Sequence, residues 1–172
     1  MSFYGEFTQK IDGKGRVSIP VDFRRALEQG DPDWTEGLRP RVRIVYGDPR
    51  RKFLECYTIS AIREVEAQIR ALPRGSQTRR LAEQFMISGS DTCEVDNDGR
   101  IVLSQKLRDR IRLRDGYGAN ETADALFAGT LDTFQIWRPD DYEDDKAARI
   151  AAMADDLPPD VDVLTLLPAL GG

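Results

Sequence analysis

The sequence of 172 residues contains no histidine and only two cysteines. Histidine is the commonest general base and the commonest metal ligand in proteins, so its absence counts against a hydrolase built on a histidine base. Cys56 and Cys93 are isolated and form no Cys-x-x-Cys motif. One disulfide between them is conceivable, but a chain of this length does not need it, and two buried, inert thiols are the expected state.

Long apolar runs are also missing. No stretch approaches the roughly 18 residues that a membrane helix needs, and residues 1–6 lack the basic start and apolar stretch of a signal peptide. We therefore expect a cytosolic protein with no membrane partner. The sequence shows no cofactor-binding loop, no cluster of metal ligands and no nucleophile–base spacing, so we expect no cofactor, no metal and no enzyme.

Positive charge is scarce overall, because 25 basic residues face 30 acidic ones and the net charge is −5. That sum argues against a nucleic-acid partner. The distribution is uneven, however: residues 139–162 hold nine acids and two bases, a net of −7, which leaves +2 on residues 1–138. A mildly basic body with an acidic segment attached favours a polyanion partner. We expect the acidic segment to aid solubility, with competition for the basic face as the alternative.

An internal repeat is what the sequence does contain, at a shift of 84 residues. Residues 11–19 (IDGKGRVSI) match residues 95–103 (VDNDGRIVL), and Phe23-Arg24 falls on Leu107-Arg108. At a shift of 80, residues 54–57 resemble residues 134–137. The sequence therefore predicts a first repeat over residues 1–75, a second over residues 76–150, and an acidic, mobile tail over residues 151–172.

Both repeats predict the same order of elements: two strands around a glycine-containing turn, a short helix, and a β-hairpin. The predicted strands are 6–12, 16–19, 41–46 and 52–57 in the first repeat, and 91–96, 100–103, 125–129 and 133–137 in the second. The predicted helices are 21–27, 60–72, 77–87 and 105–111. The apolar stripes of the two longer helices fit an ordinary core better than a contact with a neighbouring subunit.

The turn itself has the sequence Asp-x-x-Gly-Arg, from Asp12 to Arg16 and again from Asp96 to Arg100. Such an Asp can accept hydrogen bonds from backbone N–H groups of the turn and can pair with the Arg four residues later. The Arg then begins the outgoing strand, where its guanidinium can reach a phosphate or a guanine edge. One copy is better explained as a plain hairpin turn. Two copies in matching context favour a reader of repeated DNA half-sites.

Further basic residues accompany the turns, although each alone fits a solvated helix face. They are Lys14, Arg24 and Arg25, expected near the first turn, and Lys106, Arg108 and Arg110, expected near the second. Asp98 stands in the second turn where Lys14 stands in the first, and an acid at that position repels phosphate. We therefore expect the second turn to bind less strongly, or to be mainly structural.

The stretch that runs from Gly5-Glu6 through residues 11–20 to Phe23-Arg24 resembles the opening of the MraZ family of bacterial transcriptional regulators, within the SpoVT/AbrB-like class. The resemblance covers residues 1–150 and leaves the acidic tail outside. It implies an α+β fold: two tandem AbrB-like β-α-β repeats whose interlocked hairpins form a pseudo-twofold barrel, with flanking helices.

The resemblance also implies a function. The expected protein is a ring-shaped homo-oligomer, cytoplasmic and nucleoid-associated, that binds tandem direct repeats in the double-stranded promoter DNA of its own operon and represses it. That operon is the cluster of cell division and cell wall genes, and a ribosomal RNA methyltransferase encoded there is a further implied partner. The expected DNA-binding residues are Arg16 and Arg100 as readers or phosphate clamps, Asp12 and Asp96 as their orienters, and Lys14 and Arg24. The alternative is a protein-interaction regulator, antitoxin-like or methyltransferase-binding, with little DNA activity.

Overall fold

The computed structural model describes residues 2–113 and 122–170. The chain divides into two units, Met1–Pro139 and Asp140–Gly172. The strands that the structure describes all belong to the first unit, which also contains both Asp-x-x-Gly-Arg turns. The first unit therefore positions the candidate site.

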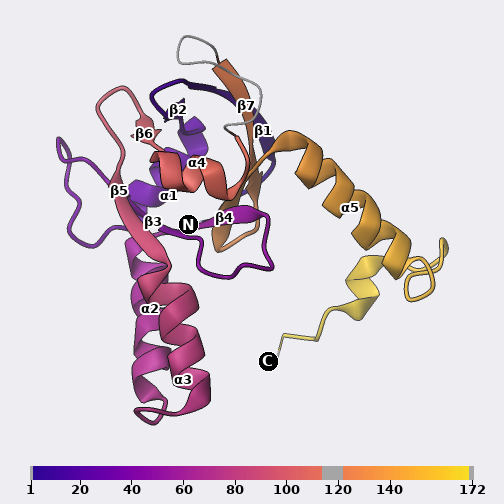
Figure 1. The fold of residues 1–172 in the computed structure, drawn as a ribbon. Helices are drawn as coiled ribbons and strands as arrows, with labels where there is room; N and C mark the ends of the chain where they lie inside the picture. Colours follow the sequence, from indigo (N-terminus) through magenta and orange to yellow (C-terminus); the bar gives the residue numbers. More distant parts are fainter. Residues whose placement is uncertain (1, 114–121, 171–172) are drawn as a thin grey trace. The chain divides into compact units, whose positions relative to one another are not determined.

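Eight strands of the first unit form one antiparallel sheet (Figure 1). They are β1 (Glu6–Asp12), β2 (Arg16–Ser18), β3 (Arg41–Val45), β4 (Phe53–Tyr57), β5 (Ser90–Glu94), β6 (Arg100–Val102), β7 (Thr122–Gly129) and β8 (Thr133–Trp137). Their order across the sheet is β5-β3-β4-β8-β7-β1-β2-β6. The two end strands, β5 and β6, are consecutive in the chain and joined by the second turn, so the sheet curls into a nearly closed barrel.

Strands from the two predicted repeats are interlocked in this barrel. β1 pairs with β7 and β2 with β6, while β3 pairs with β5 and β4 with β8. Each of these pairs joins a strand of the first repeat to a strand of the second, and the two predicted hairpins, β3–β4 and β7–β8, are both formed. The α+β barrel of interlocked hairpins is therefore confirmed. The boundaries of the repeats, 1–75 and 76–150, stay a prediction.

The core fills the inside of the barrel, because apolar residues alternate with polar ones along most strands. Its aromatic centre joins Phe3, Phe23 and Phe134, whose ring centroids lie 5.0–5.3 Å apart. Phe23 comes from α1 (Val21–Gln29), which also buries Ala26 and Leu27. Burial of a phenylalanine side chain stabilises a fold by about 1.5–3 kcal/mol. This packing fixes α1 on the barrel, and with it the position of Arg24.

The remaining helices of the first unit are α2 (Ile59–Ala71), α3 (Gln77–Ala82) and α4 (Gln105–Arg110). Hydroxyl groups of Thr58, Ser76 and Ser104 each accept a backbone N–H in the first turn of one of these helices. The helix predicted over residues 77–87 is divided instead, because α3 ends at Ala82 and a π-helical turn, Glu83–Ser88, follows. That wider turn leads to Gly89, which lies against the backbone of Gly47 with no room for a side chain. The α2 and α3 helices form a hairpin that projects from the barrel (Figure 1).

The second unit contains α5 (Pro139–Met153) and a 3₁₀ turn, Val163–Leu166. The sequence pattern does not predict α5, because the many acids of this segment leave no clear apolar stripe. Within residues 2–113 and 122–170, none of the helices combines the length and apolarity that crossing a membrane requires. Mobility of the tail over residues 151–172 stays a prediction.

The two cysteines are free, as expected. Cys56 is buried in β4, whereas Cys93 in β5 is only partly buried, so the prediction of two buried thiols is wrong for one of them. Burial raises the pKa of both thiols. Both therefore stay protonated and poorly nucleophilic at neutral pH.

Candidate nucleic-acid interface

The first turn is held together by the carboxylate of Asp12. Its Oδ1 accepts hydrogen bonds from the backbone N–H groups of Lys14 at 3.0 Å and Arg16 at 2.9 Å, and its Oδ2 accepts one from Nε of Arg16 at 2.6 Å. Partial burial acts to raise the pKa of Asp12, but these hydrogen bonds outweigh it and hold the pKa below its usual value. The carboxylate therefore stays charged and fixes the arginine fork, as the sequence predicted.

The second turn has the same backbone but a different arginine. Oδ1 of Asp96 accepts the backbone N–H groups of Asp98 and Arg100, each at 2.9 Å. The guanidinium of Arg100, however, donates from Nη2 to Oδ2 of Asp98 at 3.0 Å, and its Nε lies 3.6 Å from Oδ2 of Asp96. That buried Nε has no hydrogen-bond partner. Asp98 thus shares the charge of Arg100, which leaves less of it for a phosphate.

Both arginines lie on one outer face of the barrel, formed by the β2–β6 strand pair. Val17 pairs with Ile101 across this pair, and both side chains are buried in the core. The residues one position away, Arg16 and Arg100 among them, therefore point outward. Arg16 and Arg100 are diagonal neighbours in the register, a relation that separates Cα atoms by about 7–8 Å. A single strand pair thus carries both arginines, and each guanidinium is held by the carboxylates of its own turn.

Arginines from the two short helices cross over to the turn of the opposite repeat. Arg108 of α4 donates from Nη1 to the carbonyl oxygen of Gly13 in the first turn, at 3.1 Å. Arg24 of α1 covers Gly99 in the second turn so closely that a Cβ there would lie 2.1 Å from its Nη1. The prediction that Arg24 lies near the first turn, and Arg108 near the second, is therefore wrong. The interlocked hairpins place each helix over the turn of the other repeat.

Backbone hydrogen bonds repeat this crossed arrangement. The N–H of Ile19 donates to the carbonyl oxygen of Gly99 at 2.9 Å, and the N–H of Leu103 donates to that of Gly15 at 2.8 Å. Ile19 corresponds to Leu103, and Gly15 to Gly99, at the shift of 84 residues found in the sequence. Gly15 and Gly99 have φ angles of 85° and 76°, which only glycine adopts without strain. The two turns are therefore one pseudo-twofold unit.

The other basic residues have diverse roles. Lys14 is exposed at the tip of the first turn. Lys106, expected near the second turn, instead donates to the hydroxyl of Tyr46 and pairs with Asp91. Arg110 is likewise engaged, because it donates to the backbone carbonyl oxygens of Tyr46 and Asp48 in the loop after β3. Of these three, Lys14 is the one that lies in the same turn as Arg16.

Arg39 is a basic residue near the second turn that the sequence analysis missed. A groove of about 600 Å³ separates the loop of residues 31–40 from this turn, with Arg24, Arg39 and Asp96 on its walls. The pKa of Asp96 lies below its usual value, mainly because the carboxylate accepts a hydrogen bond from the backbone N–H of Arg100. The charge of Arg39 adds to the effect. Trp34 anchors the loop by donating from Nε1 to the carbonyl oxygen of Leu38 at 2.7 Å. No pattern in the sequence links Arg39 to the turn, because 57 positions separate it from Asp96.

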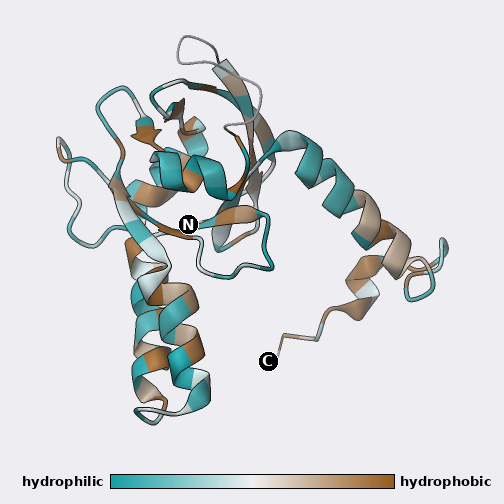
Figure 2. Cartoon of the chain, in the orientation of Figure 1, coloured by the Kyte–Doolittle hydropathy of each residue, from teal (hydrophilic) through white to brown (hydrophobic). Residues whose placement is uncertain are grey.

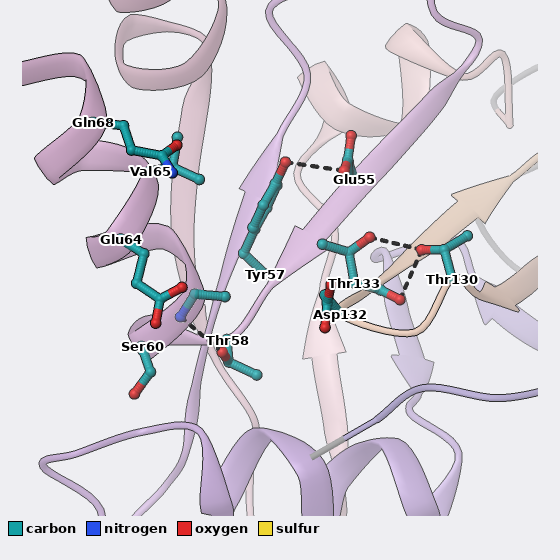
Figure 3. A pocket seen from close by; sticks show the side chains of 11 residues that line it. Glu55, Tyr57, Thr58, Ser60, Glu64, Val65, Gln68, Thr130, Asp132 and Thr133 are labelled. Carbon is teal, nitrogen blue, oxygen red and sulfur yellow. Dashed lines mark hydrogen bonds between the residues drawn. The ribbon is translucent and has the colours of Figure 1, made fainter. Parts of the chain in front are cut away.

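A second groove, of about 520 Å³, lies where α2 begins, beside β4 and the turn between β7 and β8 (Figure 3). Two of its polar side chains are engaged with each other, because the hydroxyl of Tyr57 donates to Glu55 at 2.9 Å, and Glu55 also pairs with Arg51. Burial, aided by the charge of Glu55, raises the pKa of Tyr57, which keeps the hydroxyl protonated. Because β4 and β8 lie far from β2 and β6 in the sheet order, this groove is separate from the two turns.

Comparison with known proteins decides the family. The chain is 48% identical over 170 residues to a protein of Ruegeria pomeroyi named "Transcriptional regulator MraZ", and the match covers 99% of this chain and 97% of that relative. The chain belongs to the MraZ family. A family model described as "MraZ protein", with the addition "antitoxin-like", matches residues 86–156. Relatives of the same name from Cereibacter sphaeroides and Roseiflexus sp. are 44% identical over 170 residues (99% of this chain, 98% of the relative) and 33% over 137 residues (80% and 81%).

Membership of the MraZ family confirms the resemblance that residues 5–24 carry. It corrects one detail, the expected end of the resemblance at residue 150. The matches to the Ruegeria pomeroyi and Cereibacter sphaeroides relatives span 99% of the chain, so they include the acidic C-terminal segment. That segment is therefore shared with MraZ relatives rather than peculiar to this chain.

The crossed arginines of this MraZ-family chain lead to a testable prediction. Arg108→Met removes the hydrogen bond to Gly13, so the first turn should open more often although the mutated residue lies in the second repeat. A hydrogen bond from a charged donor contributes about 1.5–3 kcal/mol, so the amides of Lys14 and Arg16 should exchange with solvent at least roughly tenfold faster. Arg24→Met should act on the amides of Asp98 and Arg100 instead. Amide exchange followed by NMR measures both; faster exchange in the same repeat as the mutation would contradict the crossed arrangement.

Proposed function

We propose that this chain is a sequence-specific DNA-binding transcriptional regulator that represses its own operon by binding tandem direct repeats in the promoter. The names of its relatives support the regulatory class. The observation that carries the proposal is the β2–β6 face, where two arginines, each beside an Asp that organises its turn, are diagonal neighbours on an exposed strand pair. In line with the MraZ resemblance, we place the regulator on the nucleoid, acting on the cell division and cell wall gene cluster.

A two-stranded ribbon fits the major groove of B-DNA, which is about 12 Å wide. In this docking the fork of Arg16, held by Asp12, meets a guanine edge or a phosphate, and Lys14 meets a neighbouring phosphate. Arg100 occupies the equivalent position in the second turn but shares its charge with Asp98. Arg24 lies over Gly99 of the second turn and adds positive charge behind it.

One copy of the chain offers few basic contacts to DNA. Affinity useful in a promoter therefore requires several copies on consecutive repeats, which makes each further contact intramolecular. This requirement, together with the MraZ resemblance, supports a ring-shaped homo-oligomer as the active form. A ribosomal RNA methyltransferase stays the second proposed protein partner.

Salt dependence tests the phosphate contacts of this proposal. Each phosphate neutralised by Lys or Arg releases counterions, so affinity falls with salt with a logarithmic slope of about −0.9 per contact. For about four contacts, binding to a duplex that carries the tandem upstream repeats should weaken roughly 100-fold between 50 and 200 mM salt. Fluorescence anisotropy of a labelled duplex measures it. An affinity that does not change over this range would contradict phosphate contacts by the two turns.

A protein-interaction regulator with little DNA activity is the second candidate. The words "antitoxin-like" in the family description and the acidic second unit favour it. Capture of a specific protein partner, without any shift of the upstream DNA, is the result that would select this candidate over the first.

A further inference from the structure

The loop of residues 31–40 ends directly beside the second turn. The N–H of Val95 donates to the carbonyl oxygen of Pro40 at 2.9 Å, one residue before Asp96. Beyond this contact the two segments continue as the paired strands β3 and β5. The barrel therefore holds the end of the loop, and Arg39 with it, against the second turn. Figure 2 shows that the loop and this turn are both largely hydrophilic, so the groove between them suits a charged ligand.

The base of this loop is fixed by a buried ion pair. The side chain of Asp31 is 2% exposed and accepts hydrogen bonds from the backbone N–H of Arg41 at 3.1 Å and from its guanidinium at 2.9 and 2.7 Å. Hydrogen bonding to Arg41 is the main reason that the pKa of Asp31 lies below its usual value. Asp33 accepts further bonds from Arg41 at 2.7 Å and from Arg63 of α2 at 3.0 Å. A loop that is already ordered loses little conformational freedom when it binds a ligand.

Two guanidinium groups on the walls of this groove lack a carboxylate partner. They belong to Arg24, whose buried Nε has no hydrogen-bond partner, and to Arg39, which is exposed. Neither forms an ion pair with the residues that the structure describes. Arg16 and Arg100, by contrast, are each bound to an aspartate of their own turn. A guanidinium without a carboxylate partner keeps its donors for a phosphate.

Three acids also line the groove, and none of them neutralises these arginines. Oδ1 of Asp96 is occupied by the backbone N–H groups of its own turn. Glu28 and Glu36 form no ion pair within the described part of the chain. Their charges oppose an anion in the groove, so the removal of one of them should strengthen the binding of a phosphate.

We propose that this groove binds a phosphate of the DNA backbone through Arg39 and Arg24 while the β2–β6 face lies in the major groove. The inference rests on the proposed DNA binding. A ribbon that enters the major groove is flanked by the phosphate backbones, and contacts to them fix the register of a protein on the duplex without reading bases. The contact also offsets the charge of Arg100 that Asp98 shares.

Arg39→Gln in the full chain tests the contact. Loss of one phosphate contact per copy should make the logarithmic salt slope of binding less steep by about 0.9 per copy engaged, and should weaken binding roughly eightfold per copy at about 0.1 M salt. The loss should be equal on the tandem upstream repeats and on a shuffled duplex, because a phosphate contact carries no sequence information. Arg39→Lys should keep most of the affinity, because an ammonium also neutralises a phosphate. Fluorescence anisotropy of labelled duplexes measures all three effects.

The two control variants differ in the expected direction. Glu36→Gln removes an acid from the groove and should strengthen binding roughly twofold. Arg74→Gln removes the same charge as Arg39→Gln from an exposed position between α2 and α3, and it should leave the salt slope unchanged. An Arg74→Gln variant that loses as much affinity as Arg39→Gln would show an effect of net charge alone and would overturn the inference.

Neutral phosphates in the DNA locate the contact. Methylphosphonate groups placed one at a time beside the repeats should include a position that weakens binding of the parent chain roughly eightfold but does not weaken the Arg39→Gln variant further. The absence of such a position, or a salt slope of Arg39→Gln equal to that of the parent, would overturn the inference while the parent still binds its repeats. A parent chain that binds no duplex would instead remove the proposed function, and this inference with it.

Discussion

Arg16→Ala is expected to lower the affinity for tandem-repeat promoter DNA by more than about 100-fold while the assembly stays intact. A bidentate arginine contact to a base contributes about 1–3 kcal/mol of discrimination. Every copy on the repeats loses its contact at once, so the losses combine across the assembly. We expect the largest loss of affinity at Arg16 because its guanidinium is fixed by a single carboxylate. Nε of Arg16 donates to Oδ2 of Asp12 at 2.6 Å, and among the described contacts no second carboxylate competes for this guanidinium. A gel-shift titration measures the effect.

Arg100→Ala is the matched comparison, since the two arginines occupy equivalent positions of the pseudo-twofold unit. The loss should be smaller, because Asp98 already shares the charge of Arg100. Asp98→Lys, which gives the second turn the residue type of the first, should strengthen binding. Wild-type affinity of the Arg16→Ala variant would remove the β2–β6 face from the proposed mechanism.

Gly15→Ala is expected to destabilise the whole barrel. The φ of Gly15 is 85°, and a Cβ at this position would lie 2.1 Å from the backbone carbonyl oxygen of Leu103. Leu103 directly follows β6 and donates its own N–H to the carbonyl oxygen of Gly15, so its backbone is held against the turn. Backbone strain and the clash together should cost about 3 kcal/mol or more. For a chain of this size the melting temperature should fall by roughly 6–12 °C.

Gly37→Ala separates the strain of the backbone from the clash. Gly37 has a φ of 93°, close to that of Gly15, but nothing lies within 4 Å of a Cβ placed there. Its variant should therefore lose only about 1–2 kcal/mol, the cost of a positive φ. Thermal unfolding followed by circular dichroism compares the two. Equal melting temperatures of the two variants would show that the close approach of Gly15 to Leu103 has no energetic role.

Much of this fold could be predicted from the sequence because it depends on interactions between residues that are close together in the chain. The strands over residues 6–12 and 133–137 have the predicted bounds. The glycines of the two turns were located because their positive φ requires glycine. The contacts that Asp12 and Asp96 make to their own turns followed from the spacing alone, because both partners lie within four residues.

The features of the candidate site that could not be predicted depend on contacts between distant parts of the chain or on side-chain geometry. The shift of 84 residues matches Arg24 with Arg108. It does not predict which turn each arginine contacts, because that depends on how the hairpins interlock. Arg39 approaches Asp96 across a loop whose path has no sequence signal. The sharing of Arg100 between Asp96 and Asp98 required side-chain geometry, although the acid at position 98 already pointed to a weaker second turn.

The central claim is that the two turns on the β2–β6 face read tandem repeats in DNA. It is tested most directly by a gel-shift comparison of the full chain on its own upstream duplex and on a duplex with the repeats shuffled at equal composition. We predict a stepwise shift of the intact repeats at protein concentrations at least about 1,000-fold below those that shift the shuffled duplex. Equal binding to both duplexes, or none to either, would contradict the claim.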